Sequence, residues 1–383
     1  MKLNPDKKSV LVFIDWFLPG DKAGGPVRSC INLIDQLGDE FRFSVVTRDT
    51  DYTSSIPYSE IKSDVWNDFE GKRIFYISQA NLNKETIARL ILEEKPDVVY
   101  LNGIWSQPFT AWPLKTLKNL KKKIKVVVAA RGMLAPSALE IKATKKKLYL
   151  RIAKWRDSFS EVIFHATNEK EAIDIRKALG DKVKCLVAGN LPRKLKSDTI
   201  HSEKTEGKLR IVNIARVAPE KNTLYALEVL RKVKSEVVAD FFGTIYDEVY
   251  AEKCRELVKA MPENVKVNFH EAVSSSAIAD LLAKYDLMFM PTRGENFGHI
   301  ILEALQSGTP VLISDQTPWK NLKEKNAGWD LPLNSISTFV ERIESLSLLN
   351  EKDFVKFRVA AKVLAENYAA DKKVMEENRN LFL

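Results

Sequence analysis

The sequence predicts an α/β protein of two Rossmann-like domains, each with a parallel β-sheet covered by helices. Its 383 residues exceed the roughly 250–300 at which a single core stops growing. Short runs rich in Val, Ile and Phe alternate with helical patterns along most of the chain. A polar stretch without apolar periodicity, residues 193–207, divides two such series and is predicted to be an interdomain linker. We therefore expect domains at 1–195 and 196–360 facing each other across an interdomain cleft, with the C-terminal helix, 361–383, crossing back to the first domain.

The first domain is expected to contain seven strands that are buried on both faces. Their near-continuous apolar runs are typical of parallel sheets. The expected strands are Ser9–Asp15, Phe41–Thr47, Arg73–Ile77, Asp97–Leu101, Lys125–Ala130, Val162–His165 and Val183–Val187. The expected helices between them include Val27–Leu37, Lys84–Glu94 and Glu169–Leu179.

The second domain repeats this alternation after the polar stretch. Its expected strands are Leu209–Ile214, Val237–Phe242, Val265–Phe269, Leu287–Met290 and Val311–Ile313. From about Ser335 the pattern is helical to the C-terminus. Because many proteins have two such domains, the architecture alone does not give the function.

Composition limits the class of protein. The chain is 45% apolar and 29% charged, as in ordinary soluble proteins, and no run reaches the ~20 apolar residues that span a bilayer. Cys30, Cys185 and Cys254 lie far apart, which argues against a disulfide framework and fits a reducing cytosol. The net charge of +9 would attract phosphates. We expect a cytoplasmic protein, at most peripheral on the inner face of the plasma membrane.

The most informative motif follows the expected strand Leu287–Met290. Open α/β sheets bind ligands at the carboxyl ends of their strands. Glu295 and Asn296 fall in this loop, and a helix is expected to begin near Gly298. The backbone N–H groups of Phe297 and Gly298 would suit a phosphate or another anionic group.

A second carboxylate and two cations complete this expected site. Glu303 lies about 8 Å into the helix, so Glu295 and Glu303 could hold two ends of one elongated ligand. Arg216 and Lys221 follow the first strand of the second domain and are placed to bind a diphosphate. Neither of these two segments contains a DxD triplet or a His-rich pattern, so they imply no metal.

A glycine loop follows the first strand of the chain. Gly24 and Gly25 permit close approach of a ligand to the backbone, and Pro26 suits the first turn of a helix. The alternative interpretation is a plain tight turn.

These motifs together resemble those of a known family. Glu295-x7-Glu303 within P-T-x-x-E-x-F-G-x-x-x-x-E-A-x-x-x-G-x-P-V is similar to the signature of the family 4 retaining glycosyltransferases of GT-B fold, the glycosyl transferases group 1. Arg216 and Lys221 resemble the phosphate-binding Arg and Lys of that family, and Gly24-Gly25 resembles its N-terminal glycine loop. The resemblance covers most of the chain and is specific mainly from Leu209 to Leu331.

The resemblance implies an enzyme that takes hexosyl or N-acetylhexosaminyl groups from a nucleotide-diphosphate sugar. Glu295 would be the catalytic, sugar-facing carboxylate and Glu303 would bind the ribose. Transfer would retain the anomeric configuration, need neither metal nor cofactor, and serve surface polysaccharide biosynthesis with a saccharide or lipid-linked glycan as acceptor. Many relatives have a His where this chain has Asn102 and Arg131, and Arg at the second position is typical of a bacterial polysaccharide-assembly subset. These two residues and Trp105 are our candidates on the acceptor side.

The segment 137–155 has two interpretations. Its lysines and arginine alternate with Leu148, Tyr149 and Ile152, so a basic amphipathic helix could dock on an anionic membrane. It could equally be a solvated face of a basic protein.

The histidines and a second tryptophan also leave alternatives. His165 and His270 each close an apolar strand, where a core or strand-end role is favoured over catalysis. His299 is expected either to be structural or to support the residues that contact the ligand. Trp319 could stack on a ligand or pack in the core.

Four other functions compete with a glycosyltransferase. A GT-B phosphorylase would bring a pyridoxal lysine, for which there is no motif, and a nucleotide-sugar epimerase is the companion enzyme hypothesis. A catalytically degenerate nucleotide-sugar-binding or scaffold subunit is the main alternative, and the intact Glu295, Glu303, Arg216 and Lys221 argue against it. The charge alone would fit a nucleic-acid protein, but no nucleic-acid-binding motif is present.

Overall fold

The chain folds into two units, each with its own sheet. The computed structural model describes residues 7–20, 22–120, 123–140, 143–155, 158–194 and 201–383. Unit 1 comprises Met1–Lys194 and Asp371–Leu383, and unit 2 comprises Leu195–Ala370. The predicted α/β class, with two parallel-sheet domains, is confirmed. The chain re-enters unit 1 at Asp371, ten residues beyond the expected boundary at 361, because the long helix α12 (Glu351–Ala369) remains in unit 2 to its end.

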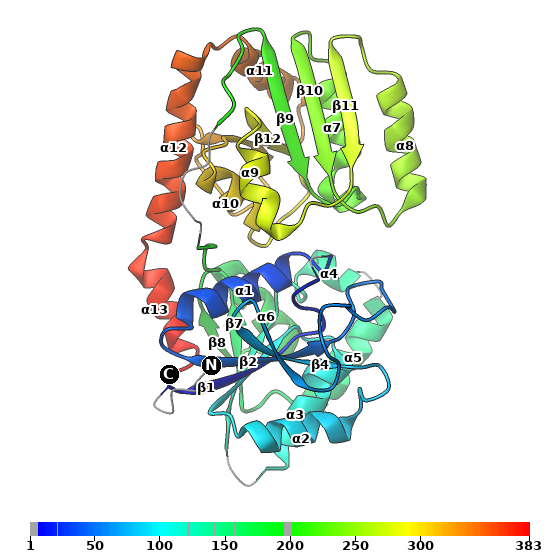
Figure 1. The fold of residues 1–383 in the computed structure, drawn as a ribbon, viewed down its shortest axis with the longest axis vertical. Helices are drawn as coiled ribbons and strands as arrows, with labels where there is room; N and C mark the ends of the chain where they lie inside the picture. The colour runs from blue at the N-terminus through cyan, green and yellow to red at the C-terminus, as the bar shows by residue number, and fades with distance from the viewer. Residues whose placement is uncertain (1–6, 21, 121–122, 141–142, 156–157, 195–200) are drawn as a thin grey trace. The chain divides into compact units, whose positions relative to one another are not determined.

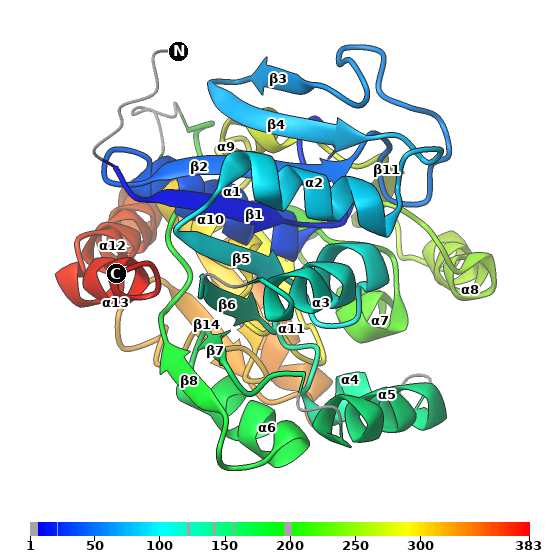
Figure 2. The same ribbon diagram turned by 90° about the horizontal axis from the view of Figure 1, so that it is seen from below.

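Unit 1 has an eight-stranded sheet in the order β3-β4-β2-β1-β5-β6-β7-β8, which Figure 2 shows side by side. All its strand pairs are parallel except β3 with β4. The strands are β1 Ser9–Phe13, β2 Arg42–Arg48, β3 Trp66–Phe69, β4 Lys72–Ile77, β5 Val98–Asn102, β6 Lys125–Ala129, β7 Val162–Ala166 and β8 Lys184–Val187. The sequence predicted seven of them and missed the edge strand β3.

Helices cover both faces of the unit 1 sheet. They are α1 Gly25–Leu37, α2 Lys84–Glu94, η1 Gln107–Ala111, α3 Trp112–Lys118, α4 Pro136–Glu140, α5 Ala143–Trp155, α6 Glu169–Leu179 and α13 Lys372–Asn380. Side chains alternate along each strand, so Leu11 and Phe13 pack in one core with α2 and α6, and Val10 and Val12 pack in the other with α1. Residues 141 and 142 of the predicted basic helix lie outside the described residues.

The C-terminus completes the second of these cores. Helix α13 lies beside the start of β1 in Figure 1, and Lys8 Nζ donates to Leu383 O at 2.9 Å. The Phe382 ring is fully buried against Phe41, Phe43 and Tyr100. The last residues of the chain are therefore part of the hydrophobic core of unit 1.

Unit 2 has a six-stranded, all-parallel sheet in the order β11-β10-β9-β12-β13-β14. Its strands are β9 Lys208–Ile214, β10 Glu236–Phe242, β11 Val265–His270, β12 Leu287–Met290, β13 Val311–Ser314 and β14 Gly328–Leu331. Its helices are η2 Pro219–Lys221, α7 Thr223–Leu230, α8 Glu248–Lys259, η3 Ser275–Ala277, α9 Ile278–Leu282, α10 His299–Gln306, α11 Ile336–Ser347 and α12. Leu287 and Phe289 pack in one core of this unit, whereas Met288 and Met290 pack in the other.

The predicted polar linker is partly built into unit 2. Residues 195–200 lie outside the described residues, whereas Lys204 is buried and its Nζ donates to Thr205 O and Lys208 O at 2.6 Å. Interpreting 201–207 as linker was therefore wrong. None of the described helices is long and apolar enough to cross a membrane.

Candidate active site

The order in which the chain adds strands to the unit 2 sheet reverses between β9 and β12. From β9 the chain continues to β10 on one side, and from β12 it continues to β13 on the other. Loops that leave two neighbouring parallel strands in opposite directions open a crevice at the carboxyl end of the sheet, where such folds bind ligands. The expected cations follow β9, and the expected carboxylate motif follows β12.

An ion pair between Lys221 and Glu295 joins these two loops. Lys221 Nζ lies 2.5 Å from Glu295 Oε1, and the two side chains are 20% and 13% exposed. The Thr292 hydroxyl lies 3.2 Å from the same oxygen. The ammonium ion is held here by the short helix η2, and the carboxylate by the loop after β12. The structure thus brings the predicted catalytic carboxylate and one predicted phosphate ligand into direct contact.

Arg216 lies in the same loop but is more open to solvent. Its side chain is 45% exposed, and its Nη2 lies 3.1 Å from Glu220 Oε1. The backbone of Glu220 accepts from Arg293 N at 3.0 Å, which ties the two loops together a second time. A guanidinium near the surface and an ammonium ion below it can neutralise a diphosphate from two directions.

The start of α10 is fixed by its glycine and by an aromatic cluster. Gly298 has φ 78°, and a Cβ there would come within 2.7 Å of Ile301 Cδ1, so both conformation and space favour glycine. The ring of Phe297 packs 5.6 Å from that of Trp319, whose Nε1 donates to Phe297 O at 2.7 Å. His299 is buried, with its ring 4.8 Å from Phe297. These contacts support the packing role of Trp319 and the structural role of His299.

Glu303 lies in the second turn of α10 and is only 6% exposed. Asn296 is half-buried in the loop before this helix. The positive end of the helix dipole is at Gly298, where it favours an anion. The structure therefore places Glu295 in the loop at the carboxyl edge of the sheet that also carries Arg216 and Lys221, and Glu303 in the helix that follows this loop.

Gly24, Asn102 and Arg131 lie where the strand order of the unit 1 sheet reverses, between β1 and β5. Gly24 has φ 75° and caps α1, which begins at Gly25, two residues before the expected start at Val27, and has Pro26 in its first turn as expected. Asn102 ends β5 and donates from Nδ2 to Pro26 O at 3.0 Å. Arg131, after β6, donates from Nε to Asn102 Oδ1 at 2.8 Å. The glycine loop, Asn102 and Arg131 therefore form one network.

Glu171, which the sequence interpretation missed, anchors this network. Arg131 has φ 52°, an unusual conformation for a side-chain-bearing residue. The next peptide is held by Glu171 Oε1, which accepts from Gly132 N at 2.5 Å, while Oε2 accepts from Thr167 N at 2.7 Å. A capping pattern, Asn168-x-x-Glu171, was the available signal, but it predicts only a helix start.

His165 is structural, as favoured from the sequence. Its Nδ1 accepts from Tyr100 Oη at 2.9 Å, and the same hydroxyl accepts from Arg131 Nη2 at 2.8 Å. Its Nε2 lies 2.8 Å from Ala188 O, so this nitrogen carries the proton. Burial, helped by the Arg131 charge, lowers the pKa of His165 to about 3. The imidazole is therefore neutral, and both of its nitrogens are hydrogen-bonded within the core.

The third acceptor-side candidate, Trp105, faces α5. Its ring meets that of Tyr149 edge-on at 5.4 Å, and Lys146 Nζ lies 5.5 Å from it. No contact between Trp105 and the Asn102–Arg131 network is found among the described residues.

His270 belongs to a separate polar cluster in unit 2. Its Nε2 lies 2.8 Å from Asp240 Oδ1, and its ring stacks on Phe242 with centroids 4.5 Å apart. Burial alone would raise the pKa of Asp240, but hydrogen bonds from His270, Asn268 and Tyr285 lower it below its usual value. The cluster pins the end of β11 to β10, in agreement with a strand-end role.

Comparison with known proteins identifies the unit that carries the Lys221–Glu295 pair. The sequence model of the family "Glycosyl transferases group 1" matches residues 196–362, all within unit 2. This unit belongs to that family. Sulfoquinovosyl transferase SQD2 of Arabidopsis thaliana is 28% identical to this chain over 104 residues, which are 27% of the chain and 19% of SQD2. The similarity thus spans less than a fifth of that relative.

Solved structures extend the likeness to the whole fold. HepE of Anabaena, in complex with UDP and glucose, has a TM-score of 0.69 at 14% identity, with 98% of both chains covered. WaaG, a glycosyltransferase involved in lipopolysaccharide biosynthesis, has a TM-score of 0.62 at 14% identity, also over 98% of both chains. The chain therefore has the two-domain GT-B fold of these glycosyltransferases.

Proposed function

We propose that this protein transfers a sugar from a nucleotide-diphosphate donor to a saccharide or lipid-linked glycan, with retention of configuration and without a metal or other cofactor. The observation that carries the proposal is the contact between Lys221 and Glu295. It lies where the strand order of the unit 2 sheet reverses, in the unit that matches the group 1 glycosyltransferases. It joins a cation suited to phosphate with a carboxylate suited to sugar hydroxyls.

Arg216 and Lys221 are assigned to the donor diphosphate. Their positive charges would stabilise the leaving nucleotide, the task that a metal performs in other transferases. The N–H groups at the start of α10, at Phe297 and Gly298, would add to this. Glu303 is assigned to the ribose and Glu295 to the transferred sugar. Since Lys221 Nζ has three donors, it can hold Glu295 and a phosphate oxygen together.

The Asn102–Arg131 network and the Gly24-Gly25 loop are assigned to unit 1's part of the reaction. Arg131 has five N–H donors, three of which bond to Asn102, Asn190 and Tyr100. The remaining donors suit an anionic or hydroxyl-rich acceptor. By analogy with WaaG, we assign the reaction to surface polysaccharide synthesis at the cytoplasmic face of the membrane.

HepE was solved with UDP and glucose, so UDP-hexoses are the first donors to test. Donor and product anomers are compared by NMR, with and without EDTA. Retention and unchanged turnover in EDTA support the mechanism, whereas inversion or loss of turnover contradicts it. Nucleotide binding without any turnover would favour the degenerate-subunit alternative.

A further inference from the structure

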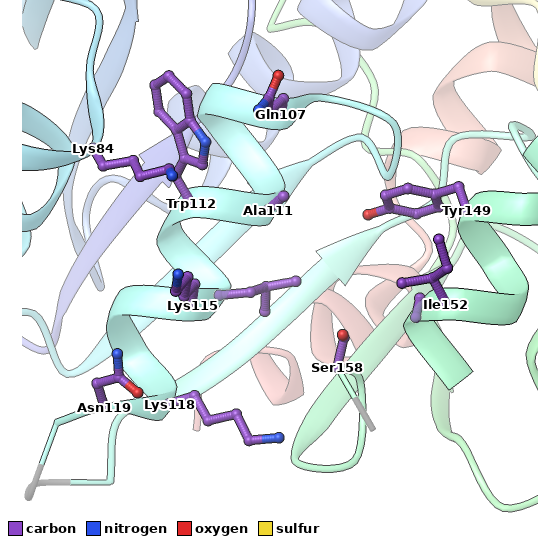
Figure 3. A pocket seen from close by; sticks show the side chains of 12 residues that line it. Lys84, Gln107, Ala111, Trp112, Lys115, Lys118, Asn119, Tyr149, Ile152 and Ser158 are labelled. Carbon is purple, nitrogen blue, oxygen red and sulfur yellow. The ribbon is translucent and has the colours of Figure 1, made fainter. Parts of the chain in front are cut away.

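Unit 1 contains a cavity that none of the candidate site residues line. Its volume is about 590 Å³, within the ~300–1,000 Å³ of small-molecule sites. It lies between α3 and α5, with Tyr149 and Ile152 projecting from α5 on one side and Trp112 and Lys115 from α3 on the other (Figure 3). The assigned donor and acceptor groups leave this space without a function.

The floor and one wall of the cavity are apolar. Leu114 and Ala153 contribute aliphatic surface that continues into the main core of unit 1. The Tyr149 ring is fixed because its hydroxyl donates to Ile104 O at 3.3 Å. Ile152 lines the cavity although its side chain is 42% exposed. Because the exposed apolar surface of Ile152 lies next to an apolar cavity, an apolar ligand in the cavity would bury it.

The opposite side carries only positive charge. Lys115 and Lys118 are one turn apart on α3, and Lys84 approaches from the start of α2. All three are exposed, and no Asp or Glu is among the described residues that line the cavity. An apolar trough edged by lysines is complementary to a molecule with one hydrocarbon chain and an anionic head.

The cavity also lies within reach of the acceptor-side network. Gln107, at its edge, is five residues after Asn102, and five residues span at most about 18 Å. A group attached to the phosphate of a ligand seated in the cavity could therefore reach Asn102 and Arg131.

We propose that the cavity binds a single-chain lipid phosphate, with its hydrocarbon chain between α3 and α5 and its phosphate at Lys84, Lys115 and Lys118. If the proposed function holds, the cavity would bind the lipid part of a lipid-linked acceptor. Each buried methylene contributes about fourfold to affinity, so chain length is a direct readout.

The test is calorimetric titration of the full chain with dodecyl phosphate below its micelle concentration. We expect saturable one-to-one binding, at least tenfold weaker binding of octyl phosphate, and no measurable binding of inorganic phosphate or dodecyl maltoside. Ile152→Glu and Lys115→Glu should each weaken binding at least tenfold. Leu92→Glu and Lys177→Glu, exposed positions of unit 1 outside the cavity, should not, and thermal unfolding checks that all four variants are folded.

Equal affinity for octyl and dodecyl phosphate, or unchanged binding in Ile152→Glu and Lys115→Glu, would overturn the proposal. UDP titrated into the same samples separates this proposal from the donor site. Dodecyl phosphate binding without UDP binding contradicts the proposed function alone, and UDP binding without dodecyl phosphate binding contradicts only the lipid site.

Discussion

Lys221 and Glu295 form an ion pair, and the proposed function assigns both residues to donor binding. A carboxylate that is 13% exposed is stabilised by the ammonium ion beside it. When a diphosphate enters, it offers the same ammonium ion a second anion. Donor binding would thus rearrange an existing ion pair, without desolvating a further charge of the protein.

Glu303 supplies the first prediction. If its buried carboxylate accepts hydrogen bonds from ribose hydroxyls, UDP should bind about 10–100 times more tightly than 2′,3′-dideoxy-UDP, since bonds to charged groups contribute ~1.5–3 kcal/mol. In Glu303→Ala the two ligands should bind alike, as measured by calorimetry. An undiminished preference in the variant would show that the ribose lies elsewhere.

His165 makes stability depend on pH. Its folded pKa of about 3 lies below the ordinary 6.5, so only the unfolded chain takes up its proton between these values. The free energy of unfolding should therefore fall as pH falls through this window, by about 1 kcal/mol per unit from this group. His165→Gln should have a correspondingly shallower slope in urea unfolding between about pH 6 and pH 4. Parallel slopes would contradict this assignment.

At the scale of elements, the loop after β9 is held by close approach of the loop after β10. Ala215 N donates to Phe242 O at 3.0 Å, and a Cβ on Gly243 would lie only 2.0 Å from Ala215 O. Arg216 is the next residue. The conformation that presents this guanidinium therefore depends on a glycine in a different loop.

Gly243→Ala should lower the free energy of unfolding of unit 2 by about 1–3 kcal/mol, because the new methyl group meets backbone. UDP affinity should fall with it as the Arg216 loop shifts. Gly294→Ala is the control, since its Cβ would find its nearest neighbour, Gln316 O, at 4.0 Å. Urea unfolding and UDP titration measure both effects, and a neutral Gly243→Ala would disprove the close approach.

Some elements could be predicted from sequence because their signal is local. Strand β12 is a continuous apolar run, and α10 begins at a glycine as expected. Strands β3 (WNDF) and β14 (GWDL) were missed because they contain polar residues and a glycine, which have low strand propensity. They are strands because they pair with β4 and β13. Lys204 was missed for a similar reason, because its carbonyl partners include those of distant Ser347 and Leu349.

The candidate site was likewise predicted in pieces. The motifs placed Lys221 and Glu295 after strands and Glu303 inside the following helix, where the structure has them. That β9 and β12 are neighbours follows from sheet order, which no local pattern encodes. The role of Glu171 depends on a hydrogen bond from Gly132, 39 positions away, so no local sequence pattern could predict it.

For the whole molecule, unit 1 is completed by the last residues of the chain. Phe382 is fully buried in it, whereas Leu383 is 64% exposed. Phe382→Ala should cost unit 1 about 3–5 kcal/mol, and Leu383→Ala less than about 0.5 kcal/mol. Urea unfolding followed with a probe in each unit should show the loss in unit 1. A loss confined to unit 2 would contradict the placement of α13.

Donor binding is the most direct test of the central claim that unit 2 binds a nucleotide-diphosphate sugar through Arg216 and Lys221. Thermal unfolding is measured with UDP-, GDP-, ADP- and dTDP-sugars, where a ligand at ~100 times its dissociation constant adds ~2.7 kcal/mol. We expect stabilisation by one nucleotide series, lost in Arg216→Ala and Lys221→Ala and kept in Arg231→Ala, an exposed residue at the end of α7 that precedes β10. No stabilisation by any donor, or equal stabilisation of all three variants, would contradict the account.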